Sequence, residues 1–261
     1  MKYAVAGKGG SGKTTIAAWL GDYLSRRGKN VWLIDADTAL SLGISMGLQR
    51  SELPTPLIQE KELINERIGE GLISLSPDVT DLPERLAVDI PLGCSEDKPS
   101  CENKRGMLRL LVMGTVAQAG EGCACRPNAL LKAVLAHLLT TEDDDVVVDL
   151  EAGVEHLGRG TIEAVDTLLI VTEPSIRSLE TACFISRLAK ELGLEKQFLI
   201  MNRFSEEQEL PEPYASTLPA VRIKVPCMAG LTEKMLDNPS VLNLPEQEKI
   251  DEIIAQIVRS R

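Results

Sequence analysis

Apolar residues along this chain fall into short continuous runs separated by stripes with helical spacing. The first series is an apolar run at residues 2–6, a stripe that places Ile16, Leu20 and Leu24 on one helical face, and a second run at 31–34. Basic residues followed by Gly28 predict where the helix ends. This strand–helix–strand order predicts a βαβ unit with parallel strands and a right-handed crossover.

The same alternation continues along the rest of the chain. Further strands are expected at 108–113, 146–149, 168–172, 198–201 and 221–225, and further helices at 128–139, 175–192 and 246–259. Strands that alternate with helices predict an α/β fold with a mostly parallel sheet flanked by helices, in a single domain over residues 1–261. Residues 51–104 are rich in Pro, Glu and Asp, so we expect an irregular insertion there, with one short strand at 72–75.

Charge and hydropathy narrow the class of protein. The chain has 28 basic and 39 acidic residues, a net charge of −11, which disfavours binding to nucleic acid through its phosphate backbone. Glycines follow the first apolar run too early for a signal peptide, and no run approaches the ~18 apolar residues of a membrane helix. We therefore expect a cytoplasmic protein without membrane or nucleic-acid partners, whose six cysteines are reduced.

A glycine-rich loop separates the first strand from the first helix. Its sequence, Gly7-Lys8-Gly9-Gly10-Ser11-Gly12-Lys13-Thr14, fits the phosphate-binding pattern G-x-x-x-x-G-K-[ST]. Glycines allow backbone N–H groups to approach phosphate oxygens, and the start of the helix adds a favourable dipole. Lys13 is expected to reach the β- and γ-phosphates, and the Thr14 hydroxyl to ligate Mg²⁺. The loop therefore predicts an ATPase that binds ATP or ADP.

Carboxylates follow two of the predicted strands. Asp35 and Asp37 come after the second strand, where aspartates also serve as caps or turn formers. Asp149 closes the run of valines at 146–148, which is the pattern of a strand whose terminal carboxylate holds Mg²⁺, in this case through a water molecule.

The string from Lys8 to Thr15 resembles the deviant phosphate loop of the MinD/ParA/nitrogenase iron protein class of ATPases. The resemblance implies a homodimer that encloses ATP, in which Lys8 crosses to the nucleotide of the partner and Asp37 orients or activates the attacking water. It also implies a second switch at 149–153. The nucleotide contacts implied by the loop and by this resemblance are Gly9, Gly10, Ser11, Gly12, Lys13, Thr14, Thr15, Asn202, Arg203 and Pro226.

Cys123 and Cys125 are separated by one residue, and a thiolate pair at this spacing can ligate one soft metal ion. The neighbouring Arg126 and a helix start at Pro127 favour the thiolate form. Zn²⁺ requires four ligands and Ni²⁺ accepts four in a plane, so two pairs from a symmetric dimer are expected to bridge one metal ion. Cys94 and Cys101 are either a second metal site, an oxidised pair or unrelated loop cysteines.

The phosphate loop, the Cys-Ala-Cys motif and the string at 149–161 together resemble the CooC/AcsF-type nickel-insertion accessory ATPases. The resemblance implies a metallochaperone that binds Ni²⁺ or Zn²⁺ at Cys123 and Cys125 of both subunits. The dimer is driven by nucleotide, by metal or by both. The resemblance also implies that its client is carbon monoxide dehydrogenase or a related nickel enzyme such as acetyl-CoA synthase.

The residues alone leave two other functions open. One is an electron-donating ATPase with a bridging iron–sulfur cluster, and the other is a positioning ATPase of the MinD/ParA type. The latter would need a membrane-binding helix, but the polar face of the stripe at 246–259 is acidic, so we expect this helix to pack against the sheet.

Overall fold

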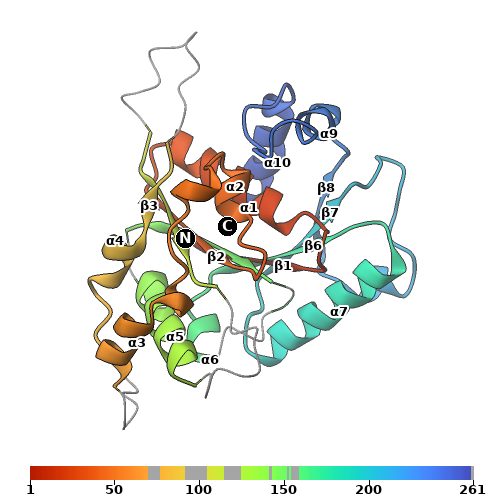
Figure 1. Ribbon diagram of the computed structural model, residues 1–261. Helices are drawn as coiled ribbons and strands as arrows, with labels where there is room; N and C mark the ends of the chain where they lie inside the picture. Colours follow the sequence, from red (N-terminus) through yellow and green to blue (C-terminus); the bar gives the residue numbers. More distant parts are fainter. Residues whose placement is uncertain are drawn as a thin grey trace.

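The computed structural model describes residues 1–69, 77–91, 105–114, 125–140, 143–151, 153 and 159–259. Eight strands of this part of the chain form one sheet in the order β3-β4-β2-β5-β1-β6-β7-β8 (Figure 1). All neighbouring strands are parallel, except that β3 runs antiparallel to β4. The strands are β1 (Lys2–Gly7), β2 (Val31–Ala36), β3 (Val88–Asp89), β4 (Leu108–Val112), β5 (Asp145–Leu150), β6 (Thr167–Thr172), β7 (Gln197–Asn202) and β8 (Val221–Val225).

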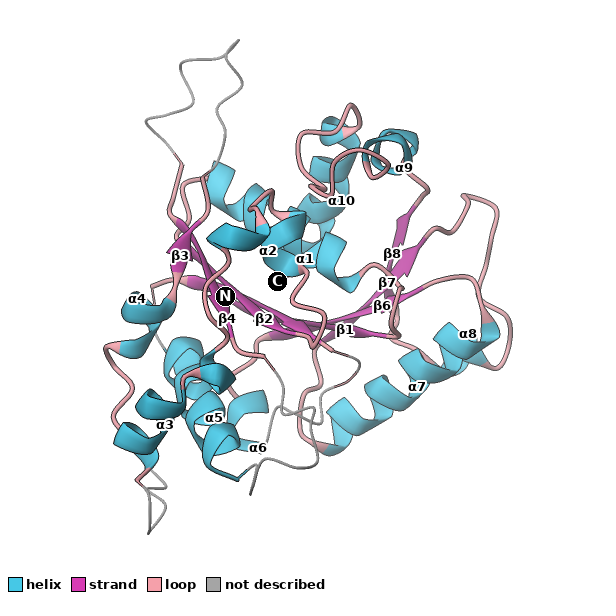
Figure 2. Cartoon of the chain, viewed as in Figure 1, coloured by secondary structure: helices cyan, strands magenta, loops and turns pink. Residues whose placement is uncertain are grey.

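Helices cover both faces of the sheet (Figure 2). One face carries α1 (Lys13–Arg26), α2 (Leu42–Ser45), α9 (Ala229–Lys234) and α10 (Gln247–Arg259). The other carries α3 (Lys61–Ile68), α5 (Cys125–Thr140), α6 (Arg159–Ile162), α7 (Ile176–Glu191) and α8 (Tyr214–Thr217). The helix α4 (Leu82–Leu86) and two 3₁₀ turns, η1 (Arg50–Glu52) and η2 (Leu57–Gln59), complete the elements of the described residues.

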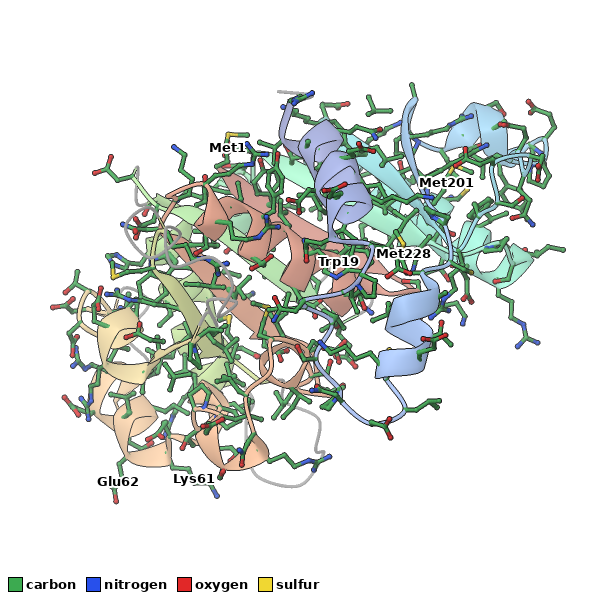
Figure 3. All side chains as sticks on the ribbon, turned by 90° about the horizontal axis from the view of Figure 1, so that it is seen from above. Met1, Trp19, Lys61, Glu62, Met201 and Met228 are labelled. Carbon is green, nitrogen blue, oxygen red and sulfur yellow. The ribbon has the colours of Figure 1, made fainter. Side chains whose placement is uncertain are left out.

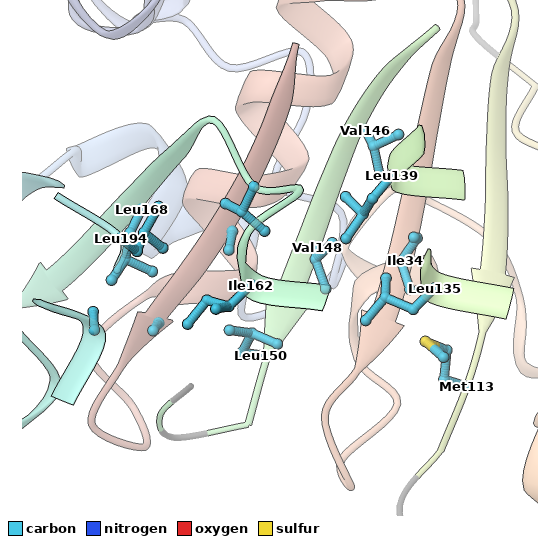
Figure 4. Close-up of a cluster of buried hydrophobic side chains, with 14 of the residues drawn as sticks. Ile34, Met113, Leu135, Leu139, Val146, Val148, Leu150, Ile162, Leu168 and Leu194 are labelled. Carbon is cyan, nitrogen blue, oxygen red and sulfur yellow. The ribbon is translucent and has the colours of Figure 1, made fainter. Parts of the chain in front are cut away.

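Two hydrophobic clusters lie on the two faces of the sheet, because successive side chains of a strand point to opposite sides. In β1, Ala4 and Ala6 belong to the cluster beneath α5 and α7, part of which Figure 4 shows. Tyr3 and Val5 belong to the cluster beneath α1 and α10. This second cluster includes Trp19 and Met228, which Figure 3 labels, and the Trp19 indole N–H donates to the Val241 carbonyl at 2.8 Å.

The predicted fold class is confirmed, and the expected strands that the structure describes extend at most two residues beyond their runs, whereas the short edge strand β3 was not predicted. The helix expected at 128–139 begins earlier, at Cys125, so that Arg126 and Pro127 lie in its first turn. The short helices α2, α6, α8 and α9 were not predicted, because each has too few residues to repeat a helical pattern.

The stretch that we expected to be an irregular insertion is partly regular where the structure describes it. Helix α3 buries Leu63, Ile64 and Ile68 and packs against α5, and the Arg67 guanidinium pairs with Asp81 just before α4 at 2.8 Å. These apolar residues share one helical face, but the many Pro and Glu residues around them made the segment look irregular by composition. The strand expected at 72–75 lies outside the described residues.

The last helix packs on the body of the protein as predicted. In α10, Ile250, Ile253, Ile254 and Ile257 are buried, and the helix contacts α1 and β8. Arg26 of α1 reaches Asp251 with both terminal guanidinium nitrogens, at 2.7 and 2.5 Å. Within the described residues, no helix combines the length and the apolar character needed to cross a membrane.

Candidate active site

The sheet brings most of the predicted site residues to one edge. In parallel strands the carboxyl ends meet at the same edge, and the loops that follow them surround a common space. The glycine-rich loop follows β1, Asp37 follows β2, Asp149 lies near the end of β5, Asn202 ends β7 and Pro226 follows β8. Residues far apart in sequence therefore converge on the loop between β1 and α1.

Glycine is required in this loop at two points of close approach. A Cβ atom on Gly7 would lie 2.2 Å from the Val171 carbonyl oxygen of β6. At Gly12, φ is +99° and a Cβ atom would lie 2.3 Å from Asn202 Nδ2. A side chain at Gly7 would collide with the backbone of β6, and one at Gly12 would be strained by the left-handed φ and would displace the Asn202 amide. The glycines therefore keep the loop's backbone N–H groups at the start of α1.

Lys13 is nearly buried, with 5% of its side chain exposed, and its ammonium lies 3.8 Å from the Asp37 carboxylate. A buried ammonium requires a negative partner, and here Asp37 provides it. The Asp37 Oδ1 atom accepts a hydrogen bond from the Ala39 backbone N–H at 2.9 Å. The two residues that we predicted to act on the phosphates and on the attacking water therefore face each other.

Asp35 fixes the loop that carries Asp37. It is fully buried, and its carboxylate accepts hydrogen bonds from the backbone N–H groups of Asp37 at 3.1 Å and Leu42 at 2.9 Å. Burial raises the pKa of this carboxyl to about 6. Asp35 thus has the turn-forming role that sequence reasoning left open for the aspartates at this strand end.

Thr14 and Asp149 offer a pair of oxygen ligands. The Thr14 hydroxyl donates to Asp149 Oδ2 at 2.6 Å, and the buried Asp149 Oδ1 has no hydrogen-bond partner in the part of the chain that the structure describes. Burial raises the pKa of Asp149 to about 7, because a desolvated carboxylate loses hydration. A hydroxyl and an unpartnered carboxylate oxygen fit Mg²⁺, which prefers hard oxygen ligands.

The end of β7 touches the backbone of the glycine-rich loop. The Asn202 amide donates to the Ser11 carbonyl at 2.7 Å, and Arg203 donates to the Gly10 carbonyl at 3.3 Å and pairs with Glu173 at 3.1 Å. Arg203 has a φ of +62°, which is uncommon outside glycine and marks a constrained position. Asn202 and Arg203 therefore support the loop, while their contact with adenine and that of the half-buried Pro226 stay predictions.

Lys8 and Thr15 are half-buried. The Lys8 ammonium contacts the Gly9 carbonyl at 3.5 Å and forms no salt bridge with any residue that the structure describes. Gly9 and Gly10 are exposed, and Ser11 is buried with its hydroxyl oxygen unpartnered among the described residues. The crossing of Lys8 to a partner subunit stays a prediction.

The comparisons with known proteins identify the family. The model of the family described as the CobQ/CobB/MinD/ParA nucleotide binding domain matches residues 3–249. The chain belongs to this family. Solved structures share the fold: MinD of Aquifex aeolicus has a TM-score of 0.66 and 21% identity, over 100% of this chain and 96% of that one. MinD of Pyrococcus horikoshii complexed with Mg-ADP has a TM-score of 0.62 and 18% identity, over 99% and 94%.

Relatives within the CobQ/CobB/MinD/ParA family are more similar in sequence. The carbon monoxide dehydrogenase accessory protein CooC of Rhodospirillum rubrum is 41% identical over 213 residues, covering 78% of this chain and 75% of CooC. An uncharacterized ATP-binding protein of Methanocaldococcus jannaschii is 37% identical, covering 80% of this chain and 78% of that protein. Together with the loop geometry, these findings confirm that the protein is a nucleotide-binding P-loop ATPase.

Unlike the residues of the nucleotide site, most of the cysteines considered as metal ligands lie outside the described residues. Cys94, Cys101 and Cys123 lie outside the described residues, and Cys125 is the first residue of α5, with its side chain also outside them. Cys183 is half-buried on α7, where burial raises its thiol pKa, and Cys227 is exposed after Pro226. Among the described residues no group of three or more His, Cys, Asp or Glu could hold a metal ion. The bridging metal site stays a prediction.

Sequence reasoning missed Thr38, which follows Asp37, and included Glu151 only as part of the second switch implied at 149–153. The Thr38 hydroxyl donates to Glu151 Oε1 at 3.0 Å, which joins the loop after β2 to the loop after β5. Threonine and glutamate are common on protein surfaces, so their type gave no signal. Only their positions, just beyond the carboxyl ends of neighbouring strands, could have indicated them.

Proposed function

We propose that this ATPase is a metallochaperone that binds nickel at a dimer interface and inserts it into the active-site cluster of carbon monoxide dehydrogenase or acetyl-CoA synthase. The observation that carries the proposal is the 41% identity with a carbon monoxide dehydrogenase accessory protein, over a chain that also has the Cys123-Ala124-Cys125 motif. The metal is the cargo of the protein, and ATP hydrolysis supplies the free energy for its transfer.

The position of the Cys-Ala-Cys motif supports a metal site. Cys125 begins α5, and a helix N-terminus stabilises negative charge, which favours the thiolates that soft metals require. One motif supplies two sulfurs, whereas Zn²⁺ and square-planar Ni²⁺ each take four ligands. Two subunits related by a two-fold axis would complete the set.

The unpaired charge of Lys8 supports the dimer. Lys8 is half-buried in the phosphate loop, yet it has no carboxylate partner among the described residues. Phosphates of a nucleotide held by a second subunit would supply the missing negative charge during phosphoryl transfer.

The residues around the loop support the following steps of hydrolysis. Lys13 binds the β- and γ-phosphates, while Thr14 and Asp149 hold Mg²⁺, which neutralises charge on the phosphates when bound. Displacement of the Lys13 ammonium toward the phosphates frees Asp37, which accepts a hydrogen bond from the attacking water. Water then attacks the γ-phosphorus, and the products are ADP and inorganic phosphate.

Metal stoichiometry tests the metallochaperone proposal. Purified ADP-bound protein is titrated with Ni²⁺ and, separately, Zn²⁺, with metal content and molecular mass measured on the same samples. We expect one metal ion per two chains and a shift from monomer to dimer, both lost in Cys123→Ala and Cys125→Ala. Cys227→Ala, which removes an exposed cysteine elsewhere, is the control and should bind like the wild type.

Three results would contradict the proposal. These are one metal ion per chain, tight binding by the variant lacking both cysteines, and failure of the nickel-loaded dimer to activate nickel-free carbon monoxide dehydrogenase or acetyl-CoA synthase. A visible absorption band from an iron–sulfur cluster in anaerobically purified protein would favour the electron-donating function instead.

A further inference from the structure

A hydrogen bond joins the loop after β2 to the loop after β5, two strands that lie on the same side of β1 in the sheet. Strands β2 and β5 are neighbours, with Ala36 opposite Leu150 in the register, so the residues that follow them emerge side by side. The Thr38 hydroxyl donates a hydrogen bond to Glu151 Oε1 at 3.0 Å and so connects the two loops. Neither residue contacts the glycine-rich loop through a hydrogen bond that the structure records.

The same hydroxyl lies near the carboxylate of Asp37. The distance from Thr38 Oγ1 to Asp37 Oδ1 is 3.4 Å, compared with 3.0 Å to Glu151. A threonine hydroxyl has one proton and can donate only one strong hydrogen bond at a time. Glu151, as the nearer carboxylate, therefore accepts the hydrogen bond that would otherwise go to Asp37.

Asp37 consequently keeps an acceptor position open. Its Oδ1 atom receives the Ala39 N–H at 2.9 Å, and its Oδ2 atom faces the Lys13 ammonium at 3.8 Å. A second donor on Oδ1 would occupy the remaining lone pair and draw the carboxylate toward Thr38. The loop is also conformationally constrained, because Leu40 has a left-handed φ of +47°.

We propose that Glu151 is a positioning residue for ATP hydrolysis: it accepts the hydrogen bond of Thr38 and so keeps the Asp37 carboxylate available to the attacking water. This inference rests on the proposed role of Asp37 in hydrolysis. It assigns to Glu151 an effect on turnover that operates through Thr38, without contact between Glu151 and the nucleotide. Thr38 is exposed and Glu151 is half-buried, so their hydrogen bond contributes little to the stability of the fold.

A double-mutant cycle on steady-state ATP hydrolysis tests the inference. Glu151→Ala is expected to lower kcat about tenfold, the effect of one charge-assisted hydrogen bond that Thr38 then donates to Asp37, with KM for ATP changed less than about twofold. Thr38→Val removes the competing donor and should keep most of the wild-type kcat. The double variant should recover most of the activity lost in Glu151→Ala, because without the Thr38 hydroxyl no donor takes the acceptor position of Asp37. Glu151→Gln and Thr38→Ser keep an acceptor and a hydroxyl, and should retain most of the wild-type kcat.

Thr181→Val is the matched control, because the Thr181 hydroxyl donates to a backbone carbonyl within α7 and this variant should hydrolyse ATP at the wild-type rate. Unchanged kcat in Glu151→Ala, a double variant as slow as Glu151→Ala, or a loss confined to KM would each overturn the inference. The Asp37→Asn variant distinguishes failure of the role proposed for Asp37 from failure of the role proposed for Glu151. Normal turnover in that variant rejects the proposed role of Asp37, whereas slow turnover in Asp37→Asn combined with no rescue in the double variant rejects only the role of Glu151.

Discussion

Thr14 donates a 2.6 Å hydrogen bond to Asp149, a residue 135 positions later in the chain. The contact exists because β1 and β5 are neighbours in the sheet, with Val5 opposite Asp149 in the register. It brings together a hydroxyl from the first turn of α1 and a carboxylate from the end of β5. Strand pairing thus brings together the two oxygen ligands that we propose for Mg²⁺.

Lys13→Ala should abolish productive ATP binding. The substitution removes the buried charge that meets the phosphates and leaves Asp37 without its partner. Because hydrogen bonds to charged groups contribute about 1.5–3 kcal/mol each, nucleotide affinity should fall roughly a hundredfold or more. Isothermal titration with ATP and ADP measures this, and Lys190→Ala, at an exposed position of α7, should bind as the wild type does. Wild-type affinity in folded Lys13→Ala protein would reject the phosphate-loop assignment.

Asp37→Asn should retain ATP binding and hydrolyse it more than about tenfold more slowly, since an amide is a poor acceptor for the proton of water. If hydrolysis releases the dimer, the variant should accumulate as an ATP-bound dimer. Phosphate release and light scattering on the same sample report both effects. Equal turnover in variant and wild type would remove Asp37 from the catalytic residues.

The stability of the Mg²⁺-free protein should depend on pH through Asp149. The folded-state pKa of this carboxyl is about 7, raised from 3.8 by burial, so the folded protein binds a proton that the unfolded chain has released. The free energy of unfolding should therefore fall as the pH rises from about 4 to about 7. Melting temperatures of the wild type and Asp149→Asn across this range test this prediction. The loss of stability with rising pH should be smaller in the variant.

Mg²⁺ should reverse this trend. The ion binds the charged carboxylate, so its affinity should rise as the pH approaches and passes about 7, and it should stabilise the folded protein most at high pH. A Mg²⁺ affinity that does not change between pH 6 and pH 8 would contradict the assignment of Asp149 as a ligand.

Asp251→Ala should destabilise the protein by about 1 kcal/mol, because it removes a partly buried bidentate partner of Arg26 and releases α10 from α1. Denaturant unfolding measures the change. The neighbouring exposed residue supplies the control, since Glu252→Ala should unfold at the wild-type midpoint. An equal effect of both substitutions would show that the contact with Arg26 contributes nothing specific.

The glycine-rich loop and the parallel sheet could be predicted because both have local signals. The loop is a contiguous string, and each buried strand of a parallel sheet is a continuous apolar run. The contact of Asn202 with Ser11 could not be predicted, since it depends on the placement of β7 within the sheet, and strand order has no signature in a single sequence.

The parts that escaped prediction share a physical cause. Helix α3 has a single apolar face within a segment dominated by Pro and Glu, so average composition suggested irregular structure. Thr38 and Glu151 are ordinary surface residue types, and only the pairing of β2 with β5 makes them neighbours. A feature that depends on the meeting of two distant segments becomes visible only in three dimensions.

The ion pair between Lys13 and Asp37 makes nucleotide binding an exchange of one anion for another. Without nucleotide, the lysine is already neutralised by a carboxylate of the same chain, so an incoming phosphate must replace it. The displaced carboxylate is the group that we assign to the attacking water. Under the role proposed for Asp37, binding of the phosphate would release the carboxylate that acts on water, so that binding and activation would be one event.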